Sequence, residues 1–156
     1  MQINFIVVGK TSSAEIKNIT SDYLKRINRY HKTEEIVVET SSLKINDKQK
    51  LMQKEGELIL KKISATDFVI LLDDKGMEQT SVQFAAYLEN IFNQSHKKIC
   101  FVVGGAFGFS EEVYKRANAK LSLSKMTFSH QIIRGIFLEQ LYRAFTIINK
   151  EPYHHE

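Results

Sequence analysis

Three glycines, Gly104, Gly105 and Gly108, follow an apolar run in the stretch ICFVVGGAFGFS (99–110). Glycine has no side chain, so a ligand can lie directly against the backbone at such positions. In open α/β sheets, ligands bind beyond the carboxyl ends of the strands, which is where this loop is expected. The glycines alone leave two interpretations open, a ligand-binding loop and a plain turn.

The spacing excludes the two common glycine motifs that bind phosphate groups. A P-loop requires G-x-x-x-x-G-K-[ST], but in VVGKTSS (7–13) the position of the first glycine is held by Asn4, inside a predicted strand. A dinucleotide fingerprint requires G-x-G-x-x-G with its last glycine inside the helix. Here the pattern is G-G-x-x-G, and the next helix is expected only from Ser110.

Two further segments carry groups suited to binding or to acid–base chemistry. LSLSKMTFSHQ (121–131) is neither a good strand nor a good helix, and its backbone donors and acceptors could grip a nucleobase. The tail EPYHHE (151–156) places a tyrosine beside two histidines, and histidine can act as a base near neutral pH. The structural alternative for the tail is a frayed terminus. No metal site is expected, because the five histidines show no ligand spacing and no cysteine pairs with them.

The composition is that of a single globular domain covering residues 1–156, with 43% hydrophobic and 26% charged residues. No run approaches the roughly 20 apolar residues that cross a bilayer, and MQINFIVVGK has no basic start or cleavage site of a signal peptide. The single cysteine, Cys100, suits a reducing cytoplasm. A net charge of +4 permits a nucleic-acid partner without requiring one. We therefore expect a cytoplasmic protein without a membrane span.

Strand-like and helix-like segments alternate along the chain. Three of the expected strands are apolar on both faces, which is typical of a parallel sheet covered by helices on both sides. The sequence thus predicts an α/β fold with a mostly parallel sheet. Strands are expected at 3–8, 35–40, 68–72, 99–103 and 119–123, and helices at about 12–30, 47–63, 80–92, from 110, and 129–149.

The last predicted helix (129–149) is apolar on more than one face between Ile132 and Ile148. A surface helix needs only one apolar stripe, so this helix is expected to be buried on two sides. The second side is expected to meet a partner subunit in a homodimer. The alternative is a helix at the centre of its own monomer. Gly135 inside this helix indicates close packing there, since it costs about 1 kcal/mol relative to alanine.

Five motifs in order resemble the RlmH family of SPOUT-superfamily methyltransferases, over the whole chain. They are LDDKG (72–76), FVVGGAFGFS (101–110), LSLSKMTFSHQ (121–131), EQLYRAF (139–145) and PYHHE (152–156). The resemblance implies a homodimer that transfers a methyl group from S-adenosylmethionine to N3 of a pseudouridine in large-subunit ribosomal RNA, on the assembled ribosome. It also implies a C-terminal trefoil knot, which periodicity cannot predict and which the general rule against knots disfavours.

The resemblance also answers what the glycines face, namely a methyl donor bound bent inside the knot. The physical reading agrees, with glycines for close approach, backbone groups for the edges of adenine and apolar side chains for its faces. The implied donor contacts are Leu72, Gly104, Gly105, Leu123, Ser124, Lys125, Met126, Thr127 and Phe128.

Catalytic groups are expected at the tail and on the last helix. His154 is the first candidate for a base or a substrate contact, with Tyr153 positioning the reacting base. Arg134 and Arg143 are candidates for contact with phosphate or a developing anion. Both arginines have a structural alternative, which for Arg143 is an i, i+4 pair with Glu139. In the family the tail usually ends in arginine or lysine, where this chain has His155, and Ser129 stands where proline is common.

A ribosomal substrate requires positive surface, which two predicted helices offer. A non-catalytic ribosome-assembly factor with the same fold is the main alternative function, although its donor site would be expected to be blocked. An enzyme with another nucleotide cofactor is disfavoured by the failed glycine spacings. The candidate basic residues are Lys17, Lys25, Arg26, Arg29 and Lys32, and further along Lys48, Lys50, Lys54, Lys61 and Lys62.

Overall fold

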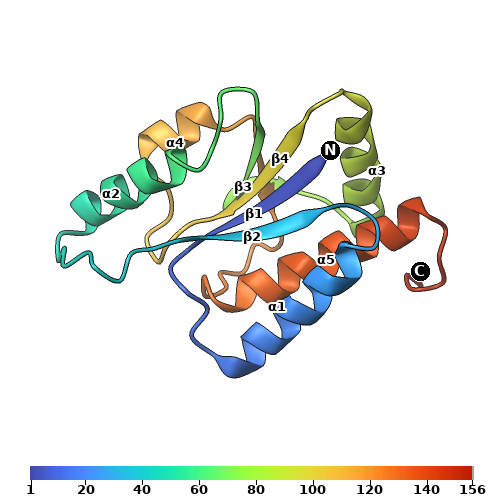
Figure 1. The fold of residues 1–156 in the computed structure, drawn as a ribbon, viewed down its shortest axis with the longest axis horizontal. Helices are drawn as coiled ribbons and strands as arrows, with labels where there is room; N and C mark the ends of the chain where they lie inside the picture. Colours follow the sequence, from blue (N-terminus) through green and yellow to red (C-terminus); the bar gives the residue numbers. More distant parts are fainter. Residues whose placement is uncertain (156) are drawn as a thin grey trace.

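A computed structural model of the chain, which describes residues 1–155, contains one five-stranded sheet in the order β2-β1-β4-β3-β5. Every pair of neighbouring strands is parallel, as the sequence predicted (Figure 1). The second strand begins and ends two residues earlier than expected. The strands are β1 (Gln2–Val8), β2 (Thr33–Val38), β3 (Phe68–Glu78), β4 (Lys98–Val103) and β5 (Ala119–Ser122).

Helices cover both faces of the sheet, which confirms the predicted layers (Figure 1). Both faces of the sheet carry apolar side chains that have to be covered. In β1, Phe5 and Val7 point to one face and Ile6 and Val8 to the other. The helices α1, α3 and α5 pack on the first face, and α2 and α4 pack on the second. The helices are α1 (Ala14–Ile27), α2 (Lys48–Leu60), α3 (Ser81–Asn93), α4 (Glu111–Arg116) and α5 (Ile132–Ile148).

Side-chain caps fix where most helices begin. Asp47, Thr80 and Ser110 accept hydrogen bonds from the backbone at the starts of α2, α3 and α4. The cap of α1 is Ser13, whose side chain accepts from Ile16 N, so this helix begins two residues later than the predicted start at about residue 12. The helix α5 begins at Ile132, three residues later than predicted, and His130 and Gln131 before it form a turn.

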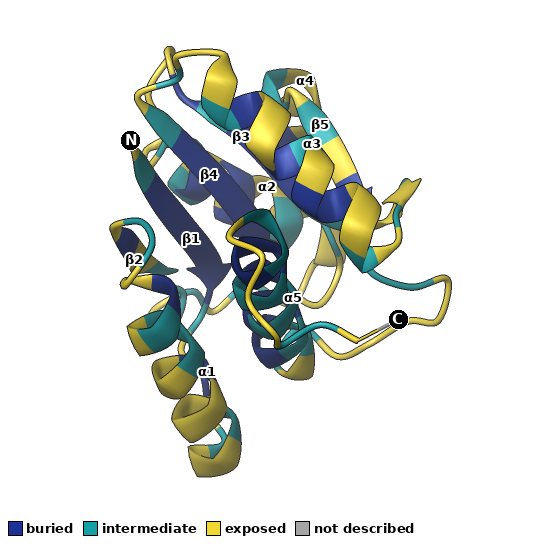
Figure 2. Cartoon of the chain, turned by 90° about the vertical axis from the view of Figure 1, so that its right-hand side faces the viewer, coloured by how far each residue is buried: buried dark blue, intermediate teal, exposed yellow. Residues whose placement is uncertain are grey.

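The helix α5 lies at the centre of its own protomer, between α1 and α3 and against the sheet (Figure 2). Phe137 stacks on Phe5 of β1, and Phe145 stacks on Tyr30 after α1. Gly135 lets α1 approach closely, since a Cβ there would lie 3.2 Å from Ile19 Cγ2. Most of the second apolar stripe is therefore covered within the monomer, which is the alternative that the sequence left open. None of the helices among residues 1–155 is long and apolar enough to cross a membrane.

The strand β3 is longer than the predicted 68–72 and bends beside β5. Leu121 of β5 is the register partner of both Leu72 and Met77, so the residues between these two leave the regular ladder. Gly76 makes this possible, because a Cβ there would lie 2.7 Å from the backbone of Leu121. The bend displaces the segment that carries Asp73 and Lys75. This segment forms part of the cavity described below.

We expect Gly76→Ala to lower the free energy of unfolding by about 1–3 kcal/mol, because backbone atoms of β5 cannot yield as a flexible side chain can. Urea unfolding followed by circular dichroism measures the change. The matched control is Met77→Ala, whose side chain is 67% exposed and whose effect should stay within about 0.5 kcal/mol. Equal effects of the two substitutions would contradict the close approach of β3 and β5.

Candidate functional site

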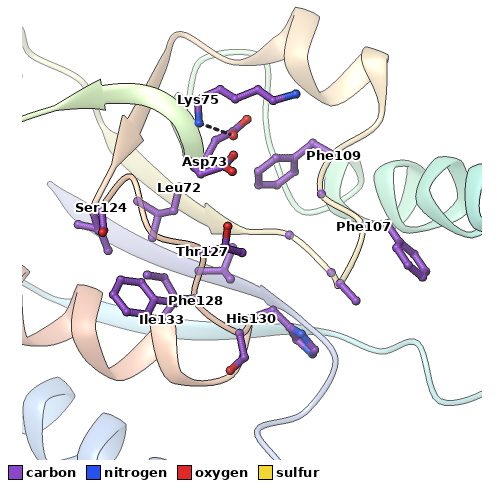
Figure 3. A pocket seen from close by; sticks show the side chains of 18 of the residues that line it. Leu72, Asp73, Lys75, Phe107, Phe109, Ser124, Thr127, Phe128, His130 and Ile133 are labelled. Atoms are coloured by element: carbon purple, nitrogen blue, oxygen red, sulfur yellow. Dashed lines mark hydrogen bonds between the residues drawn. The ribbon is translucent and has the colours of Figure 1, made fainter.

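A cavity of about 630 Å³ opens where the pairing of β3 with β4 ends, at Leu72 and Val103 (Figure 3). Parallel strands bring these ends to one edge, where loops from distant parts of the sequence meet. Three segments contribute most of the wall, namely the stretch of β3 from Leu72 to Lys75 at its irregular part, the glycine loop 103–109, and the segment 121–133. Lys48 of α2 and Tyr114 of α4 complete it.

The structure brings together nearly all the residues that the sequence assigned to a donor site. Lys125 is the exception, since it does not line the cavity although its neighbours do. Ser124 organises this segment, because its Oγ accepts a hydrogen bond from Met126 N at 2.9 Å and its carbonyl accepts one from Ser122 Oγ at 2.9 Å. The residues that do line the cavity are Leu72, Gly104, Gly105, Leu123, Ser124, Met126, Thr127 and Phe128.

The glycines serve the packing of their own loop as well as the cavity. A Cβ on Gly104 would lie 3.1 Å from the ring of Phe109 and 3.2 Å from the carbonyl oxygen of Gly108. Gly108 has φ +86°, a conformation that other residues rarely adopt. Gly108 N donates to the carbonyl of Gly105 at 3.2 Å and closes the turn. The loop therefore presents backbone rather than side chains to the cavity at these positions.

Asp73 is an ionised carboxylate in the cavity wall that the motif analysis did not single out. Burial by itself would raise the pKa of Asp73, but hydrogen bonds from Tyr114 Oη at 2.5 Å and Lys75 N at 3.0 Å outweigh burial and lower it. Burial and the bond to Asp73 raise the pKa of Tyr114. The signal in the sequence was a carboxylate directly after an apolar strand.

His130 also lines the cavity and was not named individually in the sequence analysis. Burial, and then the positive charge of Arg134, lower the pKa of His130. Near neutral pH its imidazole is therefore uncharged, which leaves one ring nitrogen free to accept a proton.

Arg134 is the largest fully buried side chain of the protein, with 0% of its surface exposed. Its guanidinium donates to the carbonyl oxygens of Val8 (2.7 Å), Gly9 (2.9 Å) and His130 (3.0 Å), and to Thr11 Oγ1 (3.0 Å). These bonds tie the end of β1 to the turn before α5. The burial favours the structural role of Arg134 over direct contact with RNA or substrate.

The tail as far as residue 155 is docked rather than frayed, and it lies outside the cavity of its own chain. Tyr153 Oη donates to Glu139 Oε1 at 3.1 Å and lies 3.3 Å from Tyr23 Oη. His154 Nδ1 lies 3.2 Å from a terminal nitrogen of Arg143. The predicted pair of Arg143 with Glu139 is present at 2.5 Å. The sequence had assigned the cavity residues and the tail residues to one reaction. Within a single chain, however, the structure places them apart.

A family model described as "Predicted SPOUT methyltransferase" matches residues 1–154. The chain belongs to the SPOUT methyltransferase family. The cavity at the carboxyl edge of the sheet is thus a candidate active site of a SPOUT methyltransferase. The trefoil knot implied by the resemblance stays a prediction.

Relatives of known name cover the whole SPOUT domain. The chain is 50% identical over 157 residues to "Ribosomal RNA large subunit methyltransferase H" of Parabacteroides distasonis, covering 100% of both chains. It is 48% identical to the protein of the same name from Christiangramia forsetii, covering 99% of each. These relatives support the family, and their printed names give the substrate that those proteins act on.

Solved structures of low sequence identity share the SPOUT methyltransferase fold. A "Probable Methyltransferase" from Bordetella pertussis Tohama I aligns with a TM-score of 0.57 at 10% identity, covering 91% of this chain and 95% of that one. A "probable methylase family protein" from Haemophilus influenzae aligns with a TM-score of 0.52 at 16% identity, covering 95% and 66%. Among residues 1–155, no three histidine, cysteine, aspartate or glutamate side chains form a group that could hold a metal ion.

Arg134→Met should lower the free energy of unfolding by about 3–5 kcal/mol, because three backbone carbonyl groups lose a charged donor in a dry environment. Arg134→Lys should restore only part of the loss, since one ammonium group cannot span the same acceptors. Urea unfolding measures both variants. Arg29→Met, at an exposed arginine in the turn after α1, is the control and should have little effect. A stable Arg134→Met protein that had lost only RNA binding would instead assign Arg134 to the substrate.

Proposed function

We propose that this SPOUT methyltransferase transfers a methyl group from S-adenosylmethionine to N3 of a pseudouridine in large-subunit ribosomal RNA on the assembled ribosome, in the cytoplasm. The observation that carries the proposal is the cavity at the carboxyl edge, which gathers the residues that the family resemblance assigned to the donor. The names of the relatives support the class of substrate. The modified position on pseudouridine rests on the resemblance alone.

The lining of the cavity fits the donor chemically. Leu72, Leu123 and Ile133 offer apolar surface to an adenine ring, and the glycine loop offers backbone groups to its edges. The ionised Asp73 offers oxygens to hydroxyl or cationic groups. S-adenosylmethionine, when bound, supplies a methyl group that is already activated on a sulfonium. The chain then has to position the acceptor and accept the N3 proton.

The hydrogen bonds of His154 favour a substrate contact rather than a base. Arginine can only donate, so His154 Nδ1 accepts from Arg143, and a neutral imidazole then carries its hydrogen on Nε2. That Nε2–H can donate to a pyrimidine carbonyl and stabilise the anion formed when N3 loses its proton. His130, neutral and inside the cavity, is the better placed of the two to accept the proton.

We propose a homodimer in which the tail of one protomer, with Tyr153 and His154, completes the cavity of the other. The tail lies outside the cavity of its own chain, so a second copy is the simplest source of these groups. Exposed apolar side chains lie on the segments that would meet a partner, and a monomer would leave them in water. They are Ile19 (47% exposed), Met126 (76%), Phe128 (40%) and Ile132 (48%).

The outer surface of α1 is a candidate contact for RNA. Lys17 and Lys25 are exposed on α1 and Arg29 in the turn that follows it, and none has a partner among the ion pairs within residues 1–155. Arg26 is instead paired with Asp22 at 2.9 Å. A protein that binds this RNA but lacks methyl transfer is the second candidate function. The open cavity disfavours it, because nothing in the lining blocks a donor.

The first test is transfer of labelled methyl from S-adenosylmethionine to ribosomes from cells lacking this protein, beside naked ribosomal RNA. We expect label on one pseudouridine of the assembled ribosomes and little on naked RNA, because the modest net charge of +4 favours reading an assembled shape. Tight donor binding without label on either substrate would favour the non-catalytic factor.

The second test asks whether the two halves of the site come from different protomers. His154→Ala removes the tail contact, and Gly104→Val blocks the loop, since its Cβ would already crowd Phe109 at 3.1 Å. Each homodimer should be nearly inactive. Mixing the two after unfolding and refolding together should restore part of the activity, because a mixed dimer has one cavity and one tail intact on opposite chains. A mixture as inactive as its parents would place tail and cavity in the same chain.

A further inference from the structure

Glu55 is a buried carboxyl group directly behind the glycine loop. It lies in α2, only 7% of its surface is exposed, and no group among residues 1–155 donates a hydrogen bond to its Oε2. A Cβ on Gly105 would lie 2.5 Å from that Oε2 and 2.8 Å from Oε1. The carboxyl group therefore lies against the loop, and Glu55 is not among the residues that line the cavity.

The packing of α2 explains how the carboxyl group reaches this position. Gly56, the next residue, has no side chain, so α2 lies directly against Ser110, where a Cβ would clash. Ser110 caps α4 and ends the glycine loop. Two turns earlier on α2, the Lys48 ammonium lies 5.0 Å from the centre of the Phe107 ring at the loop tip. The helix α2 thus holds the loop at its tip, its middle and its end.

A carboxyl group in this environment is costly for the folded protein. Burial disfavours its charged form and raises the pKa of Glu55. A buried acceptor without a donor destabilises a fold, and an apolar side chain of similar size would pack there without that cost. The polar group at this position is therefore better explained by a state of the loop in which it has a donor.

We propose that Glu55 is a positioning residue for the methyl donor, whose carboxylate accepts a hydrogen bond from the backbone of the glycine loop when the donor fills the cavity. Gly105 lines the cavity and also lies against the Glu55 carboxyl group, which does not line it, so a small movement of the loop on binding of the methyl donor can give this group a hydrogen-bond donor. Part of the binding free energy of the donor then comes from a bond that the empty protein lacks. This proposal rests on the proposed function, since it requires that S-adenosylmethionine binds in the cavity.

The experiment compares donor affinity with the stability of the empty protein in two variants. Glu55→Gln keeps a neutral acceptor, and Glu55→Met removes the acceptor while keeping the length. Titration calorimetry with S-adenosylmethionine gives Kd, and thermal unfolding without donor gives Tm. Glu57→Gln is the matched control on the same helix, because the Glu57 side chain is 51% exposed and pairs with Lys54.

We expect Glu55→Gln to weaken donor binding by about tenfold, the difference between a charge-assisted and a neutral hydrogen bond, and Glu55→Met to weaken it further. The Tm of the empty protein should stay the same or rise in both variants. The chain has only seven glycines, so ¹⁵N-glycine labelling should resolve the loop amides. Adding donor should shift a loop amide proton downfield in the unmodified protein and not in Glu55→Met.

A Kd of Glu55→Met within about twofold of that of the unmodified protein would overturn the proposal, since so small a change is less than the contribution of one hydrogen bond to binding. A joint loss of affinity and Tm would also overturn it, because that pattern marks a merely structural residue. Failure of the proposed function looks different, since the unmodified protein and Glu57→Gln would then not bind S-adenosylmethionine at all.

Discussion

The hydrogen bonds of the Arg134 guanidinium are the interaction on which the site depends most. Removing a guanidinium from water is expensive, and here the cost is offset by four acceptors at 2.7–3.0 Å, three of them backbone carbonyl groups. The bonds join the end of β1, the turn at His130 and the start of α5. Since His130 and Ile133 line the cavity, the position of its wall depends on this buried cation.

The parallel sheet determines where the cavity lies, and the glycines allow the close packing of the segments that form its wall. Parallel strands leave their carboxyl ends at one edge, so loops that are distant in sequence converge there. Gly76 lets β3 cross close to β5, and Gly104 and Gly108 let the loop after β4 fold back on Phe109. Each of these positions has no room, or the wrong backbone angle, for a larger residue. The same constraints that allow the packing leave backbone groups facing the cavity.

The two carboxyl groups near the glycine loop differ in their hydrogen-bond partners. In the cavity wall, Asp73 accepts hydrogen bonds from Tyr114 and from a backbone amide, which stabilise its charged form for contact with a polar ligand. Against Gly105, the Oε2 of Glu55 has no such donor among residues 1–155. The polar groups of the tail have hydrogen-bond partners on α5. Glu139 accepts from Tyr153, and Arg143 donates to His154. A reaction that uses both cavity and tail requires either movement of the tail or a second protomer, and the exposed Ile19 and Ile132 favour the second protomer.

The sequence by itself determined the α/β class, the parallel sheet and the approximate bounds of most strands and helices, and its motifs named most of the residues that meet in the cavity. These follow from local periodicity, local hydrogen bonds and motifs that are contiguous in the chain. The tertiary structure decided the surroundings of Arg134, Glu55 and His130. Their partners are up to 126 residues away in the sequence, and burial, which no local pattern encodes, determines whether a charged group contacts substrate or holds the fold. For the same reason only the structure shows that the tail rests on α5, outside the cavity of its own chain.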